Sequence, residues 1–157
     1  MFRIIINALF IFILSFTSLL YSQMNNGIIT NDVQETLKVI NNIREKESLF
    51  LFENDESLNN IADIRAKELS INFSHIRPNN TKYDELLYQN RIRVFSSDEN
   101  IAYRFKNAET VVSYWMNSDQ YKLNILSEKF THIGISHYAV NGEDFWVVIF
   151  VQLRRQN

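Results

Sequence analysis

The hydrophobic and polar positions of the chain follow a helical period in its first half and a strand-like period near its C-terminus. Residues 31–48 place apolar side chains at helical spacing, with Asn31 or Asp32 available as the N-cap. A second helical pattern runs from about Ser57 to Asn72, with charged residues opposite its apolar stripe. The apolar residues are Val33, Leu37, Ile40 and Ile43 in the first pattern and Leu58, Ile61, Ala62, Ala66 and Leu69 in the second. Between the two patterns, the apolar residues 49–52 are either extended or a helix end packed in the core.

The middle of the chain is predicted to hold a strand flanked by helical segments. Residues 83–88 favour a short helix, and residues 92–105 have a strand-like composition that is interrupted at residues 96–98. Asn107 is a good N-cap for a further helix that reaches about Ser118. The stretch 115–126 mixes aromatic residues with amides, which is typical of a packed helix end with its cap.

Two strand-like runs close the chain, from Ile133 to Val140 and from Phe145 to Leu153. They flank Asn141-Gly142, a dipeptide that favours a tight hairpin turn. The second run is apolar on both faces, as expected for a strand covered by helices on each side. This order predicts an α+β fold with an antiparallel sheet between helices. The side chains expected in its core are Ile133, Ile135, Val147, Ile149 and Val151, with Trp115 beneath the sheet.

The N-terminus has the features of a secretory signal peptide. One basic residue, Arg3, precedes an apolar run that ends at small and polar residues. We therefore assign residues 1–22 to a signal peptide, residues 23–32 to a short N-terminal segment and residues 33–153 to one domain. The expected location is extracellular or periplasmic. The run is a little long for a signal peptide and a little short for a spanning helix, which needs about 20 apolar residues. An uncleaved membrane anchor is therefore the alternative.

Composition excludes several classes of function. Removal of the signal peptide leaves 15 basic and 18 acidic residues, a net charge of −3, which lacks the basic surface expected of a nucleic-acid-binding protein. Arg91, Arg93 and the Arg154-Arg155 pair are interpreted as solvated surface. The absence of cysteine excludes thiol catalysis, disulfides and thiolate zinc sites. Three glycines leave no material for a phosphate-binding loop or a G-x-S-x-G nucleophile turn.

The chain has three histidines, and only one of them lies in a promising setting. His132 and His137 are five residues apart in a predicted strand, so they face opposite sides of the sheet and cannot share a site. His75 lies where the second helical pattern runs into a loop. Asp98 and Glu99 precede a strand, where a carboxylate is either paired or a solvated turn residue. No serine has the local setting of a nucleophile.

Several stretches together resemble the CAP superfamily, also called SCP-like, which includes cysteine-rich secretory proteins, antigen 5 and plant pathogenesis-related proteins of group one. The most specific are F-S-H at 73–75, E-N-I-A at 99–102 and W-M-N-S-x-x-Y-K-x-N-I-L at 115–126. The resemblance also covers N-x-x-R at 41–44, L-x-x-x-A at 58–62, F-T-H-I-G-I-S at 130–136 and F-W-V-V-I-F-V-Q at 145–152. It implies a three-layer α-β-α sandwich with a mainly antiparallel central sheet.

The resemblance also implies a surface cleft that gathers two histidines and one or two acids. His75 matches the first histidine and Glu99 the principal acid. Tyr121 stands where bacterial-type members have the second histidine, and Ser118 where many eukaryotic members have a second acid. The same motif adds Asn124 to the candidate residues. His75 and Glu99 are the only candidate metal ligands, so no cofactor is expected beyond a weakly held divalent metal.

These observations favour a secreted binding module over an enzyme. The expected partner is a small apolar molecule, a peptide or an extracellular protein, and not a nucleic acid; membrane contact is expected only with an uncleaved N-terminus. One alternative is a hydrolase of peptides or cell-envelope material with His75 as the base, although no nucleophile completes such a site. Another is a structural or adhesive extracellular domain with no active cleft.

Overall fold

The computed structural model describes residues 31–154 of the 157-residue chain. The expected signal peptide and all of residues 23–30 lie outside this range. The described part opens in a helix that extends to residue 46, so Asn31 and Asp32 are already helical and do not cap it as expected. Among the described residues, no helix has the length and apolar character that crossing a bilayer demands.

Four strands form one mixed sheet in the order β1-β3-β4-β2. Their bounds are Glu53–Asn54 for β1, Val94–Tyr103 for β2, His132–Val140 for β3 and Glu143–Leu153 for β4. The strands β2, β4 and β3 pair antiparallel, whereas the short β1 runs parallel to β3. The sheet is therefore mainly antiparallel, and β1 is the element that makes it mixed.

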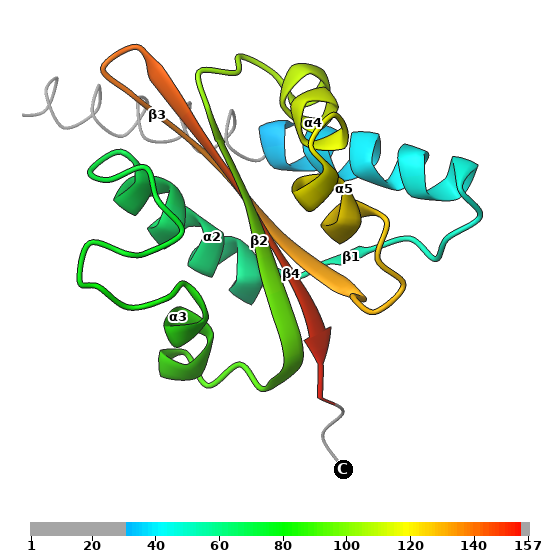
Figure 1. The fold of residues 1–157 in the computed structure, drawn as a ribbon, viewed down its shortest axis with the longest axis horizontal. Coiled ribbons are helices and arrows are strands. Elements are labelled where there is room, and N and C mark those ends of the chain that lie inside the picture. The colour runs from blue at the N-terminus through cyan, green and yellow to red at the C-terminus, as the bar shows by residue number, and fades with distance from the viewer. Residues whose placement is uncertain (1–30, 155–157) are drawn as a thin grey trace, which may run out of the picture. The chain divides into compact units, whose positions relative to one another are not determined.

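Helices cover both faces of this sheet (Figure 1). On one face lie α2 (Glu56–Leu69) and α3 (Asp84–Gln89). On the other lie α4 (Ala108–Met116), α5 (Asp119–Ile125) and the helix of residues 31–46 (Figure 1). This arrangement is the predicted three-layer α-β-α sandwich, and the predicted core is confirmed. The predicted core residues are all buried: Ile133, Ile135, Val147, Ile149, Val151 and Trp115. Trp115 Nε1 also donates to the Ile101 carbonyl oxygen at 3.2 Å.

The helix α2 packs directly on β3 because Gly134 has no side chain. A Cβ atom at Gly134 would lie 2.2 Å from the carbonyl carbon of Leu58, far inside van der Waals contact. The start of α2 is held by Asp55, whose Oδ1 accepts from the Leu58 amide at 3.0 Å. One turn further, Asn59 Oδ1 accepts from the amide of Ile135 in β3 at 2.8 Å, and so pairs a strand group beyond the end of β1.

The predicted hairpin turn and the predicted Asn107 cap are confirmed, and one strand prediction is wrong. Asn107 caps α4 through its Oδ1, which accepts from the Thr110 amide at 3.0 Å. Asn141 and Gly142 have φ angles of 53° and 80°, as a hairpin turn between right-twisted strands requires. The expected interruption at residues 96–98 is absent, because β2 runs through with only a bulge between Val94 and Ser96. Its serines have partners: Tyr83 OH donates to Ser97 Oγ at 3.1 Å.

Candidate functional site

Glu99 is a buried carboxylate in the middle of β2. It is 1% exposed, and burial of an ionised carboxylate destabilises a fold unless partners compensate for the lost water. Arg65 supplies that compensation from α2, because its Nε and Nη2 donate to the two Glu99 oxygens, each at 3.1 Å. This parallel pair of charge-assisted bonds fixes the carboxylate rigidly.

Arg65 is not among the site residues predicted from the sequence, because charged residues of this helical pattern were expected on its solvated face. Its side chain is fully buried and also donates to Glu68 Oε2 and the Ser74 carbonyl oxygen, both at 2.9 Å. Burial alone would lower the pKa of Arg65, but the bonds and charges of Glu99 and Glu68 outweigh it and the pKa is raised. The spacing of the sequence could have indicated its burial, because residue 65 lies four positions from both Ile61 and Leu69, inside the apolar stripe of α2.

A second buried arginine extends this cluster to the loop that carries His75. Arg77 is buried, and its Nη2 donates to Glu68 Oε1 at 2.7 Å. Burial raises the pKa of Glu68, but the bonds from Arg77 and Arg65 outweigh it and hold the pKa below its usual value. The loop is thereby tied to α2 on both sides of His75: at Ser74 through Arg65, and at Arg77 through Glu68.

His75 faces this cluster with one ring nitrogen and the surface with the other. Its Nδ1 lies 3.0 Å from Glu99 Oε1, and 42% of its side chain is exposed. Because a carboxylate only accepts, Nδ1 carries the proton and donates. In the neutral ring, Nε2 is then the acceptor. It lies 3.5 Å from the hydroxyl oxygen of Tyr121 in α5. His75, Glu99 and Tyr121 form what is called here the His75 site.

Aromatic side chains lie beside His75 and in the segment that leads to it. The ring of Tyr121 lies 6.2 Å from that of His75, and the ring of Tyr114 lies 6.0 Å from that of Tyr121. Phe73, two residues before His75 in the chain, has its ring 4.7 Å from that of Tyr103. Phe73, Tyr103 and Tyr114 are all exposed. Burial, and after it Tyr114 and Glu99, raises the pKa of Tyr121, so its phenol stays protonated at neutral pH. The site therefore presents a histidine nitrogen and a protonated phenol beside aromatic rings.

Asn124 and Ser118 are placed differently from the other candidates. Asn124 is buried, and its Nδ2 donates to Asn100 Oδ1 at 2.9 Å, while Asn100 Nδ2 donates to the Tyr121 carbonyl oxygen at 3.0 Å. This chain of amides fixes α5 against β2 and so positions Tyr121. Ser118 is the N-cap residue of α5 but makes no side-chain cap bond, and no described contact joins it to His75.

The other two histidines have structural partners. They lie on opposite faces of β3, as the strand period predicts. His132 Nδ1 lies 2.9 Å from Thr131 Oγ1. The ring nitrogens of His137 lie 2.6 Å from Asp32 Oδ2 and 2.9 Å from Asp144 Oδ1, and its ring stacks on Trp146. His137 therefore ties the helix of residues 31–46 to the start of β4.

The donor set of the His75 site does not fit a catalytic zinc ion. Such a site normally takes three protein ligands from His, Glu, Asp and Cys. Both Glu99 oxygens accept from Arg65, and one of them also accepts from His75. That leaves the Nε2 of one imidazole and a protonated phenol. Within residues 31–154, no group of three or more His, Cys, Asp or Glu side chains is placed to hold a metal ion.

The Glu68 contacts predict acid sensitivity. A carboxylate whose pKa is lowered on folding stabilises the protein fully above its unfolded pKa, and this contribution is lost as pH falls through the folded value. We therefore expect the free energy of unfolding to decline as pH falls below the usual Glu value of 4.5. Glu68→Gln should reduce stability at neutral pH and flatten this decline, as measured by urea denaturation across that pH range. Glu45→Gln, at an exposed position, is the control; an equal flattening in it would contradict the assignment.

The chain belongs to the CAP family, the cysteine-rich secretory protein family, whose sequence profile matches residues 37–152. The family motifs identified in the sequence lie within that range.

Similar proteins come from several bacteria. The chain is 29% identical over 120 residues to the uncharacterized protein YkwD of Bacillus subtilis (strain 168), covering 75% of this chain and 46% of YkwD. A solved extracellular protein containing an SCP domain from Bacillus anthracis is 25% identical with a TM-score of 0.74, covering 80% of this chain and 41% of that one. An outer surface protein of Borrelia burgdorferi shares the fold, with a TM-score of 0.73, 22% identity and coverage of 79% of this chain and 94% of that one. This chain therefore spans less than half of the first two proteins.

Proposed function

We propose that the protein is a secreted binding module that recognises a peptide, an extracellular protein or a small apolar molecule through the His75 site. One observation carries the proposal. Arg65 fixes Glu99, which accepts from His75 Nδ1. The Nε2 atom is then left to accept, and it lies next to Tyr121 on a side chain that is 42% exposed. A fixed hydrogen-bonding atom beside aromatic rings is typical of a recognition site, because the aromatic groups supply contact area and the polar atom supplies orientation.

Export supports the same proposal. The charge, apolar run and small residues of segment 1–22 favour a signal peptide. A similar structure belongs to an extracellular protein of Bacillus anthracis. We therefore place the domain outside the cytoplasm, in the extracellular space or the periplasm.

Hydrolysis is the second candidate, and it has less support. His75 is held by Glu99 as a general base would be. The nearest hydroxyl, that of Tyr121, is protonated and 3.5 Å away, and no other nucleophile is bonded to Nε2 among the described residues. A base without a nucleophile, a metal or a second acid leaves hydrolysis incomplete.

Binding and cleavage are separable in one experiment. The ring ¹⁵N signals of His75 are followed by NMR during titration with Nile red, a neutral apolar probe, and with a pool of short aromatic peptides. We expect the signals to shift with at least one probe, and binding of that probe, measured by calorimetry, to be lost in His75→Ala. Casein and peptidoglycan are incubated in parallel, and neither should be cleaved. Cleavage that His75→Ala abolishes would establish the hydrolase instead, and unshifted signals with no cleavage would indicate a purely structural domain.

Zinc affinity is predicted to depend on residue 121. We expect the native protein to bind zinc more weakly than micromolar at neutral pH, because only one imidazole nitrogen is available. Tyr121→His should strengthen binding by about tenfold or more, since a second imidazole then faces His75 Nε2. Calorimetry with zinc alone measures this, and Tyr121→Phe is the matched control with no gain. Tight binding by the native protein that is lost in His75→Ala would show that the metal ligands have been misassigned.

A further inference from the structure

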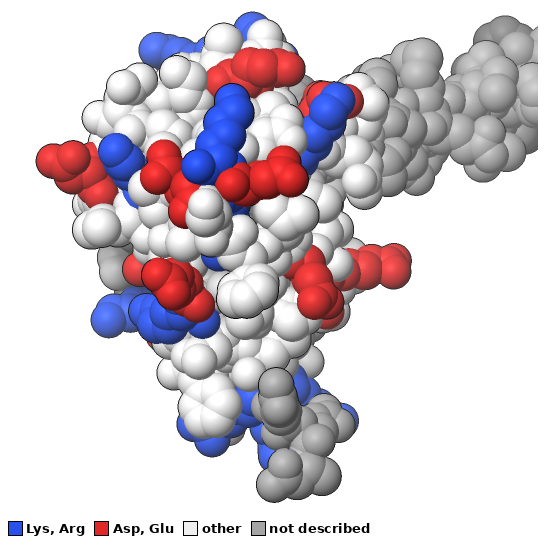
Figure 2. Space-filling view, turned by 90° about the vertical axis from the view of Figure 1, so that its right-hand side faces the viewer, with Lys and Arg blue, Asp and Glu red and all other residues white. Residues whose placement is uncertain are grey.

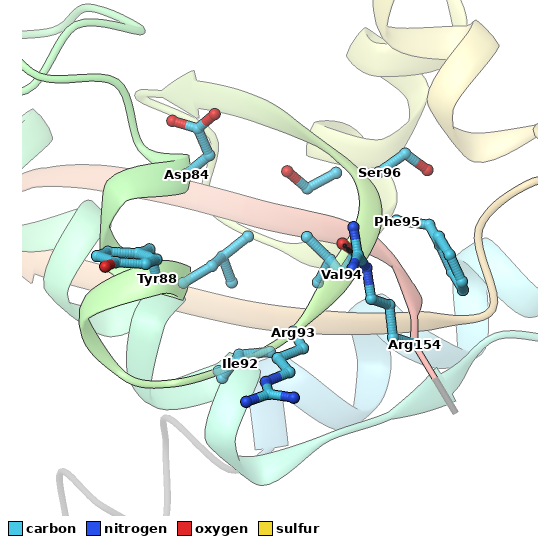
Figure 3. Close-up of a pocket in the computed structure, with 10 residues that line it drawn as sticks. Asp84, Tyr88, Ile92, Arg93, Val94, Phe95, Ser96 and Arg154 are labelled. Carbon is cyan, nitrogen blue, oxygen red and sulfur yellow. Dashed lines mark hydrogen bonds between the residues drawn. The ribbon is translucent and has the colours of Figure 1, made fainter. Parts of the chain in front are cut away.

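A groove away from the His75 site separates α3 from the first residues of β2. It has a volume of about 580 Å³, and the residues that matter here are Leu87, Tyr88, Arg93, Val94, Phe95 and Arg154. Figure 3 shows Tyr88 on one side and Phe95 on the other, with Val94 and Arg154 between them. A second hollow of about 420 Å³ shares Tyr88, Ile92 and Arg93 with the first and extends to Arg91. Together the two hollows are called the Arg93 groove.

The arginines of this groove have no carboxylate partner among the described residues. The other described arginines are satisfied: Arg65, Arg77 and Arg104 by carboxylates, and Arg44 by backbone carbonyl groups. Arg91, Arg93 and Arg154 form no ion pair within residues 31–154, although the protein as a whole is acidic. In Figure 2, basic side chains are visible at the lower end of the molecule.

One of these arginines is held in place and another is strained. Arg154 Nε donates to the Val94 carbonyl oxygen at 3.1 Å, and its guanidinium lies 5.0 Å from the Phe95 ring, so its remaining N–H groups are pre-positioned. Arg91 has a φ of 59° just after α3, a left-handed position that glycine usually fills. Residues that cost stability in this way concentrate at functional sites.

We propose that the Arg93 groove binds an acidic segment of another protein in an extended conformation. Carboxylates of the segment pair with Arg93 and Arg154, and its apolar side chains lie between Tyr88 and Phe95, which are 78% and 64% exposed. Asp84 lines the other end of the groove and repels carboxylates there, which sets the direction of the segment.

A peptide fits this groove better than a lipid surface does. The groove is concave, whereas a membrane presents a broad, nearly flat face. In addition, β2 is the last strand of the sheet among the described residues, so its outer edge faces no further strand there. An extended chain can pair with such an edge through its own backbone.

The test uses a fluorescent peptide of alternating valine and glutamate with the full-length mature protein. We expect fluorescence anisotropy to detect binding that weakens with added salt and by about tenfold in each of Arg93→Gln and Arg154→Gln. Arg104→Gln, at an exposed arginine paired with Glu143, is the matched control and should bind as the native protein does. A valine–glutamine peptide should not bind, and an N-methylated valine–glutamate peptide should bind more weakly.

Other results overturn the proposal. Equal binding of the valine–glutamine peptide would show that charge pairing does not contribute. Equal binding of the N-methylated peptide would show that backbone pairing with β2 does not contribute. Binding of phosphatidylglycerol vesicles, but not of the peptide, would make the surface a membrane contact. Arg91→Gly separates binding from folding. It should raise the thermal midpoint of unfolding, because glycine suits the left-handed φ, and it should lower the affinity for the peptide. Unchanged affinity in all three arginine variants would refute the site while leaving the His75 site untouched.

Discussion

Replacement of Gly134 by alanine is expected to destabilise the protein by at least about 3 kcal/mol, the upper part of the range for overpacked cores. The reason is that the added methyl group would lie 2.2 Å from the Leu58 carbonyl carbon and 2.3 Å from its oxygen. Backbone cannot rotate away as a flexible side chain would. The helix α2 must therefore move off β3, and with it the buried Arg65 that holds Glu99. Urea denaturation followed by tryptophan fluorescence measures the loss.

A matched control lies two residues along the same strand. Ser136 is buried, and its hydroxyl has no hydrogen-bond partner among the described residues. Because an unpaired buried hydroxyl is unfavourable, Ser136→Ala should leave stability unchanged or raise it slightly. The pair of variants separates close helix–strand contact from a general sensitivity of β3. A Gly134→Ala protein as stable as the native one would mean that α2 does not approach β3 as described.

Arg65→Met is expected to cost about 3–5 kcal/mol, because it leaves the buried Glu99 carboxylate without its main counter-charge. The hydrophobic replacement has a similar length, so little of the loss comes from an empty cavity. The variant Glu99→Gln should cost less, since the amide still accepts a hydrogen bond. Chemical denaturation gives both values, and the ¹⁵N signals of His75 should show a less ordered ring in each variant.

The double variant Arg65→Met/Glu99→Gln, which combines the two single changes, gives the sharper result. If the two residues form one buried pair, removing both costs less than the sum of the single losses. Arg104→Met serves as the exposed reference, because its surface pair with Glu143 is worth under about 1 kcal/mol. Strictly additive losses for Arg65 and Glu99 would show that the two side chains do not interact.

Elements with a strong period were predictable from the sequence. The α2 stripe, the β3–β4 hairpin and the Asn107 cap follow from spacing and capping chemistry. By contrast, β1 has only two residues and depends on β3, 79 positions later, for its pairing. Helix α5 is short, and two hydrogen bonds hold it against β2: Asn124 donates to the Asn100 side chain, and Asn100 donates to the Tyr121 carbonyl oxygen. Such elements depend on tertiary contacts that no local pattern records.

The candidate site divides in the same way. His75 and Glu99 were selected through the family resemblance, since residues 24 positions apart carry no local sign of contact. Arg65 was missed because an arginine in a helix is usually solvated, and only its two carboxylate partners make burial acceptable. Ion pairs between distant segments are therefore the part of this site that local sequence patterns do not reveal.

The two edges of the sheet differ in how far their outward backbone groups are occupied, and the side-chain amide of Asn59 contributes to this difference. On the β3 side, the short β1 and then the Asn59 side chain occupy the outward backbone groups as far as Ile135. That part of the margin is closed to an incoming chain, which limits lateral association there. At the opposite margin, no described strand lies beyond β2. A chain that lengthens this sheet would therefore add more readily next to β2, where no described strand or side chain of this kind occupies the edge.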